Sequence, residues 1–411
     1  MDYEKRRRKM QYIPMFARGE ISERECARMI GIKPVSVWRL KKRYLRFGNA
    51  IWVHGNTGRT PQNKKYDYEK IRADYRKFDG TPFMSFRWNC ADYLHYAELP
   101  SYSTIRNVLT SAGIASPRAR VPARGRKHLP RLERPSEGDM IQIDASSHDW
   151  FMNGHRITLH GAIDDATHKI VALYFCENEC LLGYYQLLRQ VLSRTGGLPR
   201  AIYSDRSRCF FARRGDSSEE LVCNNGRMET QWQRTCRELQ IELIAAYSPQ
   251  AKGRIERLWQ TLQGQLPFIF RHLGIATAEK ANAFLGGFIA RFNKRFTVPA
   301  RDPAIHWKTP PFDDVDFEYL FSVRINKRTR ADGSFIYRGF SFRIDAPGSS
   351  RASFTLCLSE SAGIRARVGG TYFPVVLTGT SARTVSAVVG ELIRRSFLAD
   401  THSEKAVSGA G

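Results

Sequence analysis

The sequence predicts a multidomain protein with α-helical domains first, an α/β core in the middle and a small β-barrel near the end. Its 411 residues exceed what one hydrophobic core usually organises, so we expect about three domains. The apolar pattern is helical up to residue 114, alternates between short strands and helices from residue 138, and consists of short alternating strands after Phe312.

Positive charge is concentrated in the front third of the chain. The formal net charge is +25, and residues 1–134 contain 30 Lys and Arg against 12 Asp and Glu. This bias predicts that the front third binds a polyanion.

The eight cysteines form no CxxC pair and have no paired histidine spacing. We therefore expect reduced thiols, with a zinc site or a disulfide framework as the alternative. No run of 18 apolar residues is present, so we expect a soluble protein with no membrane partner.

Residues 1–50 are predicted to form a helix-turn-helix DNA-binding domain. Ser22 and Glu25 make a capping box for one helix, Gly31 forms the turn, and a second helix runs from Pro34 to Leu45. The outer side of that second helix and its entry present the residues predicted to contact DNA, which are Lys33, Ser36, Arg39 and Arg43. A surface helix with solvated charges is the alternative.

Residues 67–114 are predicted to form a second helix-turn-helix-like domain. Ser101 or Ser103 can cap its last helix, and an apolar stripe through Ile105 and Val108 would face inward. Ser103, Arg106 and Asn107 would then point outward toward DNA. A plain three-helix packing module is the alternative.

Residues 115–136 are predicted to be a basic, proline-rich linker. Its prolines prevent a helix, and its cations favour an extended strap along a phosphate backbone. The residues predicted to contact DNA here are Arg118, Arg120, Arg124, Arg126 and Lys127. A solvated linker that touches nothing is the alternative.

Residues 137–297 are predicted to form a mixed α/β core, because strands and helices alternate there. The expected strands are Met140–Asp144, Thr158–Asp164, Ile170–Cys176, Ala201–Ser204 and Glu242–Ala246. The expected helices are Leu181–Arg194, Met228–Leu239 and Ala251–Leu266, the last interrupted by Pro267.

Residues 313–380 are predicted to form the small β-barrel, and residues 381–411 a C-terminal helix and tail. The expected barrel strands are Tyr319–Ile325, Ser334–Tyr337, Phe340–Ile344, Ser353–Leu358 and Thr371–Leu377, and the expected helix is Ala382–Phe397.

Two aspartates, Asp144 and Asp205, each follow a short apolar strand. A helix joins the two strands, which favours a parallel arrangement, and neighbouring strands would set the carboxylates roughly 5 Å apart. That spacing suits hard cations such as Mg²⁺, because Mg²⁺ takes oxygen ligands. Taken singly, each aspartate is more often a cap or a turn residue.

Glu256 lies on the polar side of an amphipathic helix, where it could reach the same site. Lys252, one turn earlier, would contact a DNA phosphate. A solvated Glu256 paired with Arg257 or Lys252 is the alternative.

Four further residues near the aspartates are polar and titratable. Asp164 and Asp165 form a tight turn between two strands and are expected to be structural. His148 and Asp149 are expected to line a loop.

Together the three acids resemble the catalytic core of DDE transposases and retroviral integrases. The motifs that carry the resemblance are Ile143-Asp144, Tyr203-Ser-Asp205-Arg206 and Ser248-Pro-Gln-Ala-Lys-Gly-Arg-Ile-Glu256-Arg-Leu. The chain looks closest to bacterial insertion-sequence transposases of the ISNCY group. Two features depart from the family: Glu256 follows Asp205 by an unusually long interval, and Arg206-Ser207 replaces a common Asn-Gly.

The resemblance implies an RNase H-like core that cleaves DNA and transfers strands, with Asp144, Asp205 and Glu256 as catalytic residues that hold two Mg²⁺ ions, for which Mn²⁺ can substitute. It also implies double-stranded DNA partners, namely terminal inverted repeats and target DNA, a homo-multimer on DNA, and a bacterial cytoplasmic, nucleoid-associated location. A non-catalytic DNA-binding protein derived from a transposase and an RNase H-type nuclease are the rival hypotheses.

Overall fold

A computed structural model describes most of the chain, and its residue contacts divide the protein into two compact units, Met1–Asp67 and Tyr68–Gly411. The described residues are 3–53, 66–117, 132–212, 221–224, 227–246, 253–310, 319–346, 348–378 and 382–398. Each unit is considered by itself.

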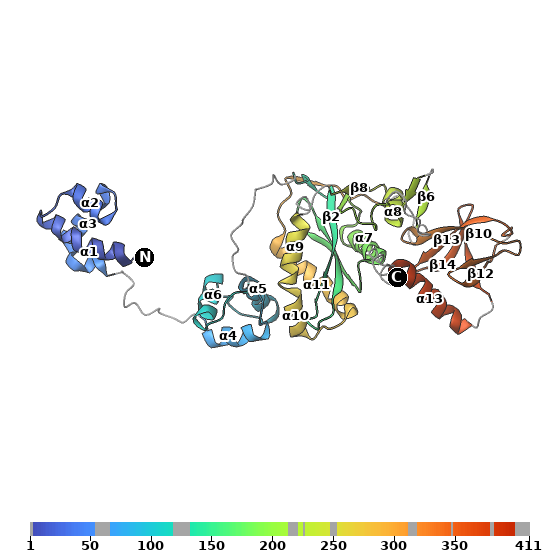
Figure 1. Ribbon diagram of the computed structural model, residues 1–411, viewed down its shortest axis with the longest axis horizontal. Helices are drawn as coiled ribbons and strands as arrows, with labels where there is room; N and C mark the ends of the chain where they lie inside the picture. The colour runs from blue at the N-terminus through green and yellow to red at the C-terminus, as the bar shows by residue number, and fades with distance from the viewer. Residues whose placement is uncertain are drawn as a thin grey trace, which may run out of the picture. The chain divides into compact units, whose positions relative to one another are not determined.

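The first unit is a group of short helices around a small apolar core (Figure 1). Its elements are α1 (Tyr3–Arg18), α2 (Glu23–Ile30), α3 (Pro34–Phe47) and the 3₁₀ turn η1 (Gly48–Trp52). The predicted capping box is present, since the Glu25 N–H donates to Ser22 Oγ and the Ser22 N–H donates to Glu25 Oε2. Gly31 ends α2 with a φ of 71°, a left-handed conformation that favours glycine.

The second unit begins with three helices, of which the second packs against a long helix of the core. They are α4 (Tyr68–Lys77), α5 (Phe83–Tyr93) and α6 (Tyr102–Ser111), and the long helix is α11 (Ala278–Phe296). Ser101 caps α6 by accepting the Thr104 N–H at 3.1 Å. Arg295 donates to both oxygens of Asp92, at 2.8 and 3.1 Å, and thereby ties α11 to α5.

A five-stranded mixed sheet forms the centre of the second unit, in the order β4-β3-β2-β5-β8. Its strands are β2 (Met140–His148), β3 (Ile157–Asp164), β4 (Ile170–Cys176), β5 (Ala201–Ser204) and β8 (Glu242–Ala245). β3 runs antiparallel to both of its neighbours, whereas β2, β5 and β8 pair in parallel.

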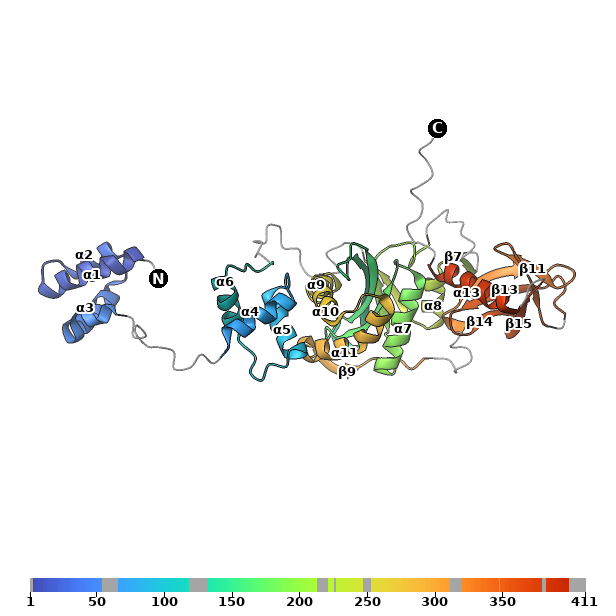
Figure 2. The same cartoon turned by 90° about the horizontal axis from the view of Figure 1, so that it is seen from below.

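Helices cover both faces of this sheet (Figures 1 and 2). One face carries α7 (Leu181–Thr195) and α8 (Gln231–Glu238), and the other carries α9 (Gly253–Gln263), α10 (Leu266–Leu273) and α11. Alternation along β2 explains the division, because Ile141 and Ile143 join the α7 core while Gln142 and Asp144 face α9. Two small ladders complete the region: β1 (Ser136–Glu137) with β9 (Asp302–Ile305), and β6 (Val222–Asn224) with β7 (Arg227–Glu229).

Three predicted boundaries in the core were wrong. β2 does not end at Asp144 but continues to His148, because Ala145–His148 pair with β3. The helix expected from Met228 starts at Gln231, where Thr230 forms a capping box, and the preceding residues belong to β7. Pro267 does not interrupt a helix but lies in the first turn of α10, where its missing N–H costs nothing.

A six-stranded antiparallel sheet follows the core, in the order β10-β13-β14-β15-β12-β11. Its strands are β10 (Val323–Arg328), β11 (Ser334–Tyr337), β12 (Phe340–Ile344), β13 (Ser353–Ser359), β14 (Gly363–Val368) and β15 (Thr371–Leu377). The sheet curls toward closure, since the rings of Phe335 on β11 and Phe354 on β13 lie 4.7 Å apart. The sequence missed β14 and placed the first strand four residues too early.

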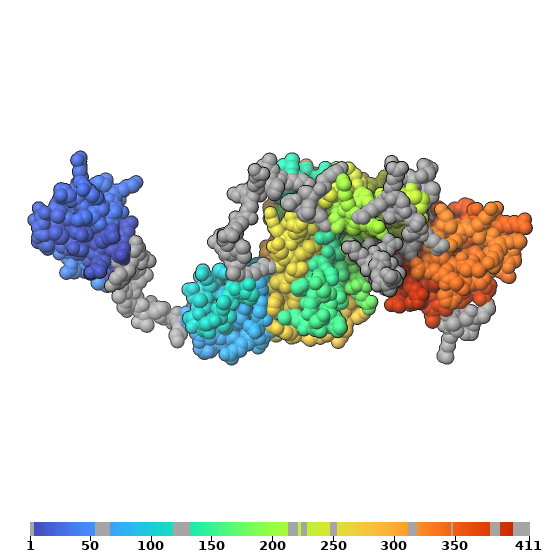
Figure 3. All heavy atoms as spheres, in the orientation of Figure 1, coloured from blue at the N-terminus to red at the C-terminus, as the bar shows by residue number. Residues whose placement is uncertain are grey.

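The helix α13 (Ala382–Leu398) packs against this sheet. Figure 3 shows its atoms, in red, against the orange atoms of the strands, and Ser396 Oγ lies 2.9 Å from the Tyr337 hydroxyl. The described part of the chain contains no helix long and apolar enough to span a bilayer.

Buried charges attach the C-terminal sheet to α8. Arg234 of α8 donates to the carbonyls of Leu320 and Ser322 at 3.1 and 2.7 Å. Glu238 accepts from Arg234 and from Arg324 of β10, both at 2.9 Å. Burial and the nearby charge of Arg234 lower the pKa of the Arg324 guanidinium. The sheet and the core therefore share one polar interface.

Candidate functional site

Asp144 and Asp205 occupy matching positions on neighbouring parallel strands. β2 and β5 pair with Gln142 beside Tyr203, and the same register continued by two residues places Asp144 beside Asp205. Strands in a sheet lie about 4.8 Å apart, so the two carboxylates lie side by side on one face of the sheet. Both residues are half-buried, which leaves them within reach of a solvated cation.

Three hydrogen bonds attach α9 to the strand that carries Asp144. They run from the Ile255 N–H to Gln142 Oε1 at 3.3 Å, from Trp259 Nε1 to Asp144 Oδ2 at 2.9 Å, and from Gln263 Nε2 to Ser146 Oγ at 3.1 Å. The bonded residues are every fourth one on α9 and every second one on β2. Four residues of helix rise about 6.0 Å and two residues of strand rise about 6.6 Å, so the spacings match. The three bonds together fix the position of α9 along β2.

The contact between Trp259 and Asp144 depends on a glycine. Gly161 of β3 lies directly opposite Asp144 in the ladder. A Cβ atom at Gly161 would lie 2.5 Å from Trp259 Cη2, closer than carbon atoms approach, so only glycine leaves room for the indole. The sequence analysis missed both Gly161 and Trp259, because they are distant in sequence.

Asp205 is oriented by its own turn. Its Oδ1 accepts the Ser207 N–H at 3.0 Å, a local bond typical of an aspartate that closes a turn. The departure from the family at Arg206-Ser207 therefore leaves this backbone donor in place.

Glu256 is exposed in the first turn of α9. It does not join Asp144 and Asp205 in one cluster, since no group of three or more His, Cys, Asp or Glu suited to a metal ion occurs among the described residues. Lys252 lies outside the described residues.

Glu179 is a further carboxyl near the pair that the sequence analysis missed. It follows β4 and accepts a hydrogen bond from the Tyr184 hydroxyl at 2.6 Å. Burial raises the pKa of the Glu179 carboxyl, and the negative charges of Asp205 and Asp144 add to the rise. The available signal was an acid three residues after the end of a buried strand.

Asp164 and Asp165 have structural roles, as predicted. Asp164 is fully buried and accepts hydrogen bonds from the Thr167 backbone and hydroxyl and from the Gly138 N–H. Asp165 accepts from Gln142 Nε2 at 2.9 Å. Burial raises the pKa of the Asp164 carboxyl.

The residues predicted to line a loop, His148 and Asp149, lie where β2 ends. Asp149 accepts the N–H groups of Asn153 and Gly154, both at 3.0 Å, and so closes the loop that follows β2. Burial lowers the pKa of His148. Asp149 therefore shapes the loop that follows β2, as expected.

The residues predicted to contact DNA lie at the surface wherever the structure describes them. Lys33, Arg39 and Arg43 on or beside α3 are exposed, and Ser36 is half-buried. Ser103, Arg106 and Asn107 on α6 are exposed. Arg118, Arg120, Arg124, Arg126 and Lys127 lie outside the described residues.

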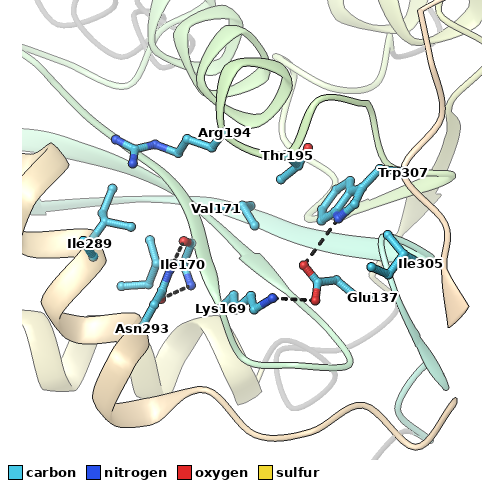
Figure 4. Close-up of a pocket in the computed structure, with 11 residues that line it drawn as sticks. Glu137, Lys169, Ile170, Val171, Arg194, Thr195, Ile289, Asn293, Ile305 and Trp307 are labelled. Carbon is cyan, nitrogen blue, oxygen red and sulfur yellow. Dashed lines mark hydrogen bonds and ion pairs between the residues drawn. The ribbon is translucent and has the colours of Figure 1, made fainter. Parts of the chain in front are cut away.

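A cavity of about 370 Å³ lies away from the candidate acids, near the start of β2. Figure 4 shows Lys169 and Trp307 directed at the Glu137 carboxylate, with Arg194 apart from them. Glu137 of β1 accepts hydrogen bonds from Lys169, which precedes β4, and from Trp307, which follows β9. These bonds hold β1, β4 and β9 together.

Two curated relatives are similar to much of the chain. The putative transposase y4bF of Sinorhizobium fredii is 34% identical over 298 residues, which are 70% of this chain and 62% of that protein. The transposase for insertion sequence IS1202 of Streptococcus pneumoniae is 30% identical over 327 residues, which are 70% of this chain and 68% of that protein. The chain thus spans less than two thirds of the first relative's length.

No protein-family model matches the sequence. Among solved structures, a chain of the simian T-cell lymphotropic virus intasome, bound to the PP2A regulatory subunit B56 gamma, is 13% identical with a TM-score of 0.32, and the match covers 76% of this chain and 96% of that one.

The fold and the site define a multidomain α/β protein in which the register of two parallel strands of a mixed sheet brings two aspartates side by side. The similarity to the Streptococcus pneumoniae protein extends through two thirds of that relative at 30% identity. The chain belongs to the transposases of insertion sequences.

Proposed function

We propose that the chain is a DDE transposase that cleaves DNA at the ends of its element and joins those ends to target DNA. The observation that carries the proposal is the parallel register of β2 and β5, which, continued by two residues, brings Asp144 beside Asp205. Glu256 is the proposed third acid, because its helix is bonded along the strand that holds Asp144.

The aspartate pair fits two divalent cations, Mg²⁺ or Mn²⁺. Half-buried carboxylate oxygens are the ligands these ions prefer, and one oxygen of each aspartate is already oriented, by Trp259 and by the Ser207 N–H. When bound, such ions lower the pKa of an attacking water or 3′-hydroxyl and stabilise the leaving oxygen. The chain itself positions the carboxylates and the phosphate of the scissile strand.

Two finer assignments of fold support this function. The strand order with an antiparallel β3 is that expected for an RNase H-like core, and α2, a three-residue turn and α3 have the form of a helix-turn-helix. We assign double-stranded DNA, both terminal inverted repeats and target, as the partner. A homo-multimer follows, because two element ends must meet in one complex.

A non-catalytic DNA-binding protein is the second candidate. This hypothesis is favoured by the position of Glu256, which does not cluster with the two aspartates among the described residues. Without a third metal ligand the protein would bind DNA but not cleave it.

The test compares nicking with binding. Asp144→Asn, Asp205→Asn and Glu256→Gln proteins are assayed in Mg²⁺ and Mn²⁺ on duplexes from the DNA that flanks the gene. Glu242→Gln, an exposed acid at the opposite end of the β5–β8 pair, is the matched control. We expect nicking by the parent and the control, none by the three variants, and equal binding by all. Nicking retained by the Glu256→Gln protein would show that Glu256 is not a catalytic residue. A parent protein that binds DNA without nicking it would support the non-catalytic DNA-binding protein.

A further inference from the structure

The solvent face of α3 carries apolar side chains that the sequence analysis did not use. Val37 is fully buried, and Leu40 and Tyr44 pack against the same core, so the opposite side of the helix faces solvent. On that side Val35 and Trp38 are 61% and 56% exposed.

These exposed residues form an apolar strip that runs along the helix. At about 100° per residue, the strip starts at Val35 near the middle of the solvent face and continues through Trp38 and Leu45 on one edge, while the basic residues lie in the middle and on the other edge. The exposed basic residues of α3 are Arg39, Lys42, Arg43 and Arg46. α3 has no acidic residue, and among the described residues none forms an ion pair with Arg39, Lys42 or Arg43.

The occupant of such a face must be anionic and must also offer apolar groups. The major groove of DNA meets both requirements, because phosphates line it and each thymine presents a 5-methyl group there. A 14-residue helix fits this groove, and residues in its N-terminal part meet the base edges. Val35 and Trp38 lie in that part of α3, whereas Leu45 lies near its C-terminus.

We propose that Val35 and Trp38 determine DNA sequence preference by contacting thymine methyl groups in the major groove, while Arg39 and Arg43 contact the phosphates beside them. The proposal rests on the proposed function, since it names the groups with which this transposase would recognise DNA. It assigns specificity to exposed apolar residues rather than to the cations.

The experiment removes the methyl groups from the DNA. Duplexes from the DNA that flanks the gene are prepared with thymine and again with uracil, which keeps base pairing and charge. Binding of the full chain is measured by fluorescence anisotropy. We expect about a fourfold loss of affinity for each contacted thymine replaced, the value for one buried methyl group.

Four variants locate the contact. Val35→Ala and Trp38→Ala proteins should each bind thymine DNA more weakly and lose part of the discrimination against uracil DNA, and the double variant should lose all of it. Leu45→Ala, an equally exposed apolar residue on the same strip, should keep the parent's discrimination. Because all three residues are exposed, circular dichroism should show an unchanged helix content.

The outcomes separate the proposal from the function on which it rests. A parent that binds both duplexes equally overturns the methyl contact and leaves DNA binding intact. Discrimination that survives undiminished in the double variant assigns it to other residues and overturns the proposal. A parent that binds neither duplex removes the proposed function as well. Loss of self-association in Trp38→Ala, measured by light scattering, would make the strip an interface between copies and overturn the proposal.

Discussion

Replacement of Gly161 by alanine should disable the candidate site while leaving the fold intact. The new Cβ would lie 2.5 Å from Trp259 Cη2 and 3.2 Å from Leu173 Cδ2. Ordinary carbon contacts require about 3.5 Å or more, so the indole must move by about 1 Å.

That movement breaks the hydrogen bond to Asp144. The bond from Trp259 Nε1 to Asp144 Oδ2 is 2.9 Å long, and about 1 Å more exceeds the normal range for N–H···O bonds. Overpacking costs about 1–3 kcal/mol of unfolding free energy. A catalytic group misplaced by about 1 Å costs about 100-fold in rate, so we expect a loss of nicking of that order.

The assay pairs nicking rates with urea unfolding and DNA binding. Gly286→Ala is the matched control, because the nearest atom to its new Cβ is Arg194 Nη2 at 3.7 Å and alanine in a helix stabilises by about 0.5–1 kcal/mol relative to glycine. Trp259→Phe removes the N–H donor without adding bulk. It should lower nicking while causing less destabilisation than Gly161→Ala.

Two results would refute this reasoning. Full nicking by Gly161→Ala would mean that the indole does not position Asp144. Full nicking by Trp259→Phe, with loss in Gly161→Ala, would mean that packing rather than the hydrogen bond matters.

Two further predictions concern stability. Glu238→Gln leaves Arg234 and Arg324 buried beside each other, so we expect a loss of about 3–5 kcal/mol and release of the C-terminal sheet, measured by thermal unfolding and limited proteolysis. An unchanged melting temperature would contradict this. Asp164→Asn should cost about 1–3 kcal/mol through lost acceptors. Burial raises the pKa of Asp164 in the folded state. Protonation of Asp164 therefore adds fully to the free energy of unfolding below the ordinary aspartate pKa, and this contribution is lost as the pH rises through the pKa of the folded state. The stability difference between parent and Asp164→Asn should therefore shrink over that window, as followed by urea unfolding at several pH values, and a difference that grows with pH would contradict the assignment.

Local patterns in the sequence predicted much of the fold. β4 and β5 lie at their predicted bounds, because each is a short apolar run that ends at a polar turn. The parallel direction of β2 and β5 followed from the rule that a helical connection favours parallel strands, whereas their adjacency was assumed and is shown by their pairing. α1 was missed, since Pro14 lies inside it and charged residues fill its first half.

Features that depend on tertiary contacts could not be predicted. The fit of Trp259 over Gly161 joins residues 98 positions apart, and no periodicity in either segment signals it. The ion pair between Arg295 and Asp92 joins α11 to α5, two helices that are in contact although all five strands of the core sheet lie between them in the sequence. Sequence patterns show which residues are buried, but the partner of each depends on how the elements pack.

The buried charges between α8 and the C-terminal sheet limit how these transposases can exchange parts. A chimera that joined β10–β15 of this chain to the core of a relative would separate Arg324 from its own partner, Glu238. Arg324 would then be largely buried without the partner it has in this chain, and Glu238 in the converse chimera would lose the same ion pair. An exchange that keeps these contacts must therefore transfer α8 together with the sheet, although the strands β8 and β9 and the helices α9, α10 and α11 lie between them in the chain. The inherited module is a set of contacting elements and not a continuous segment.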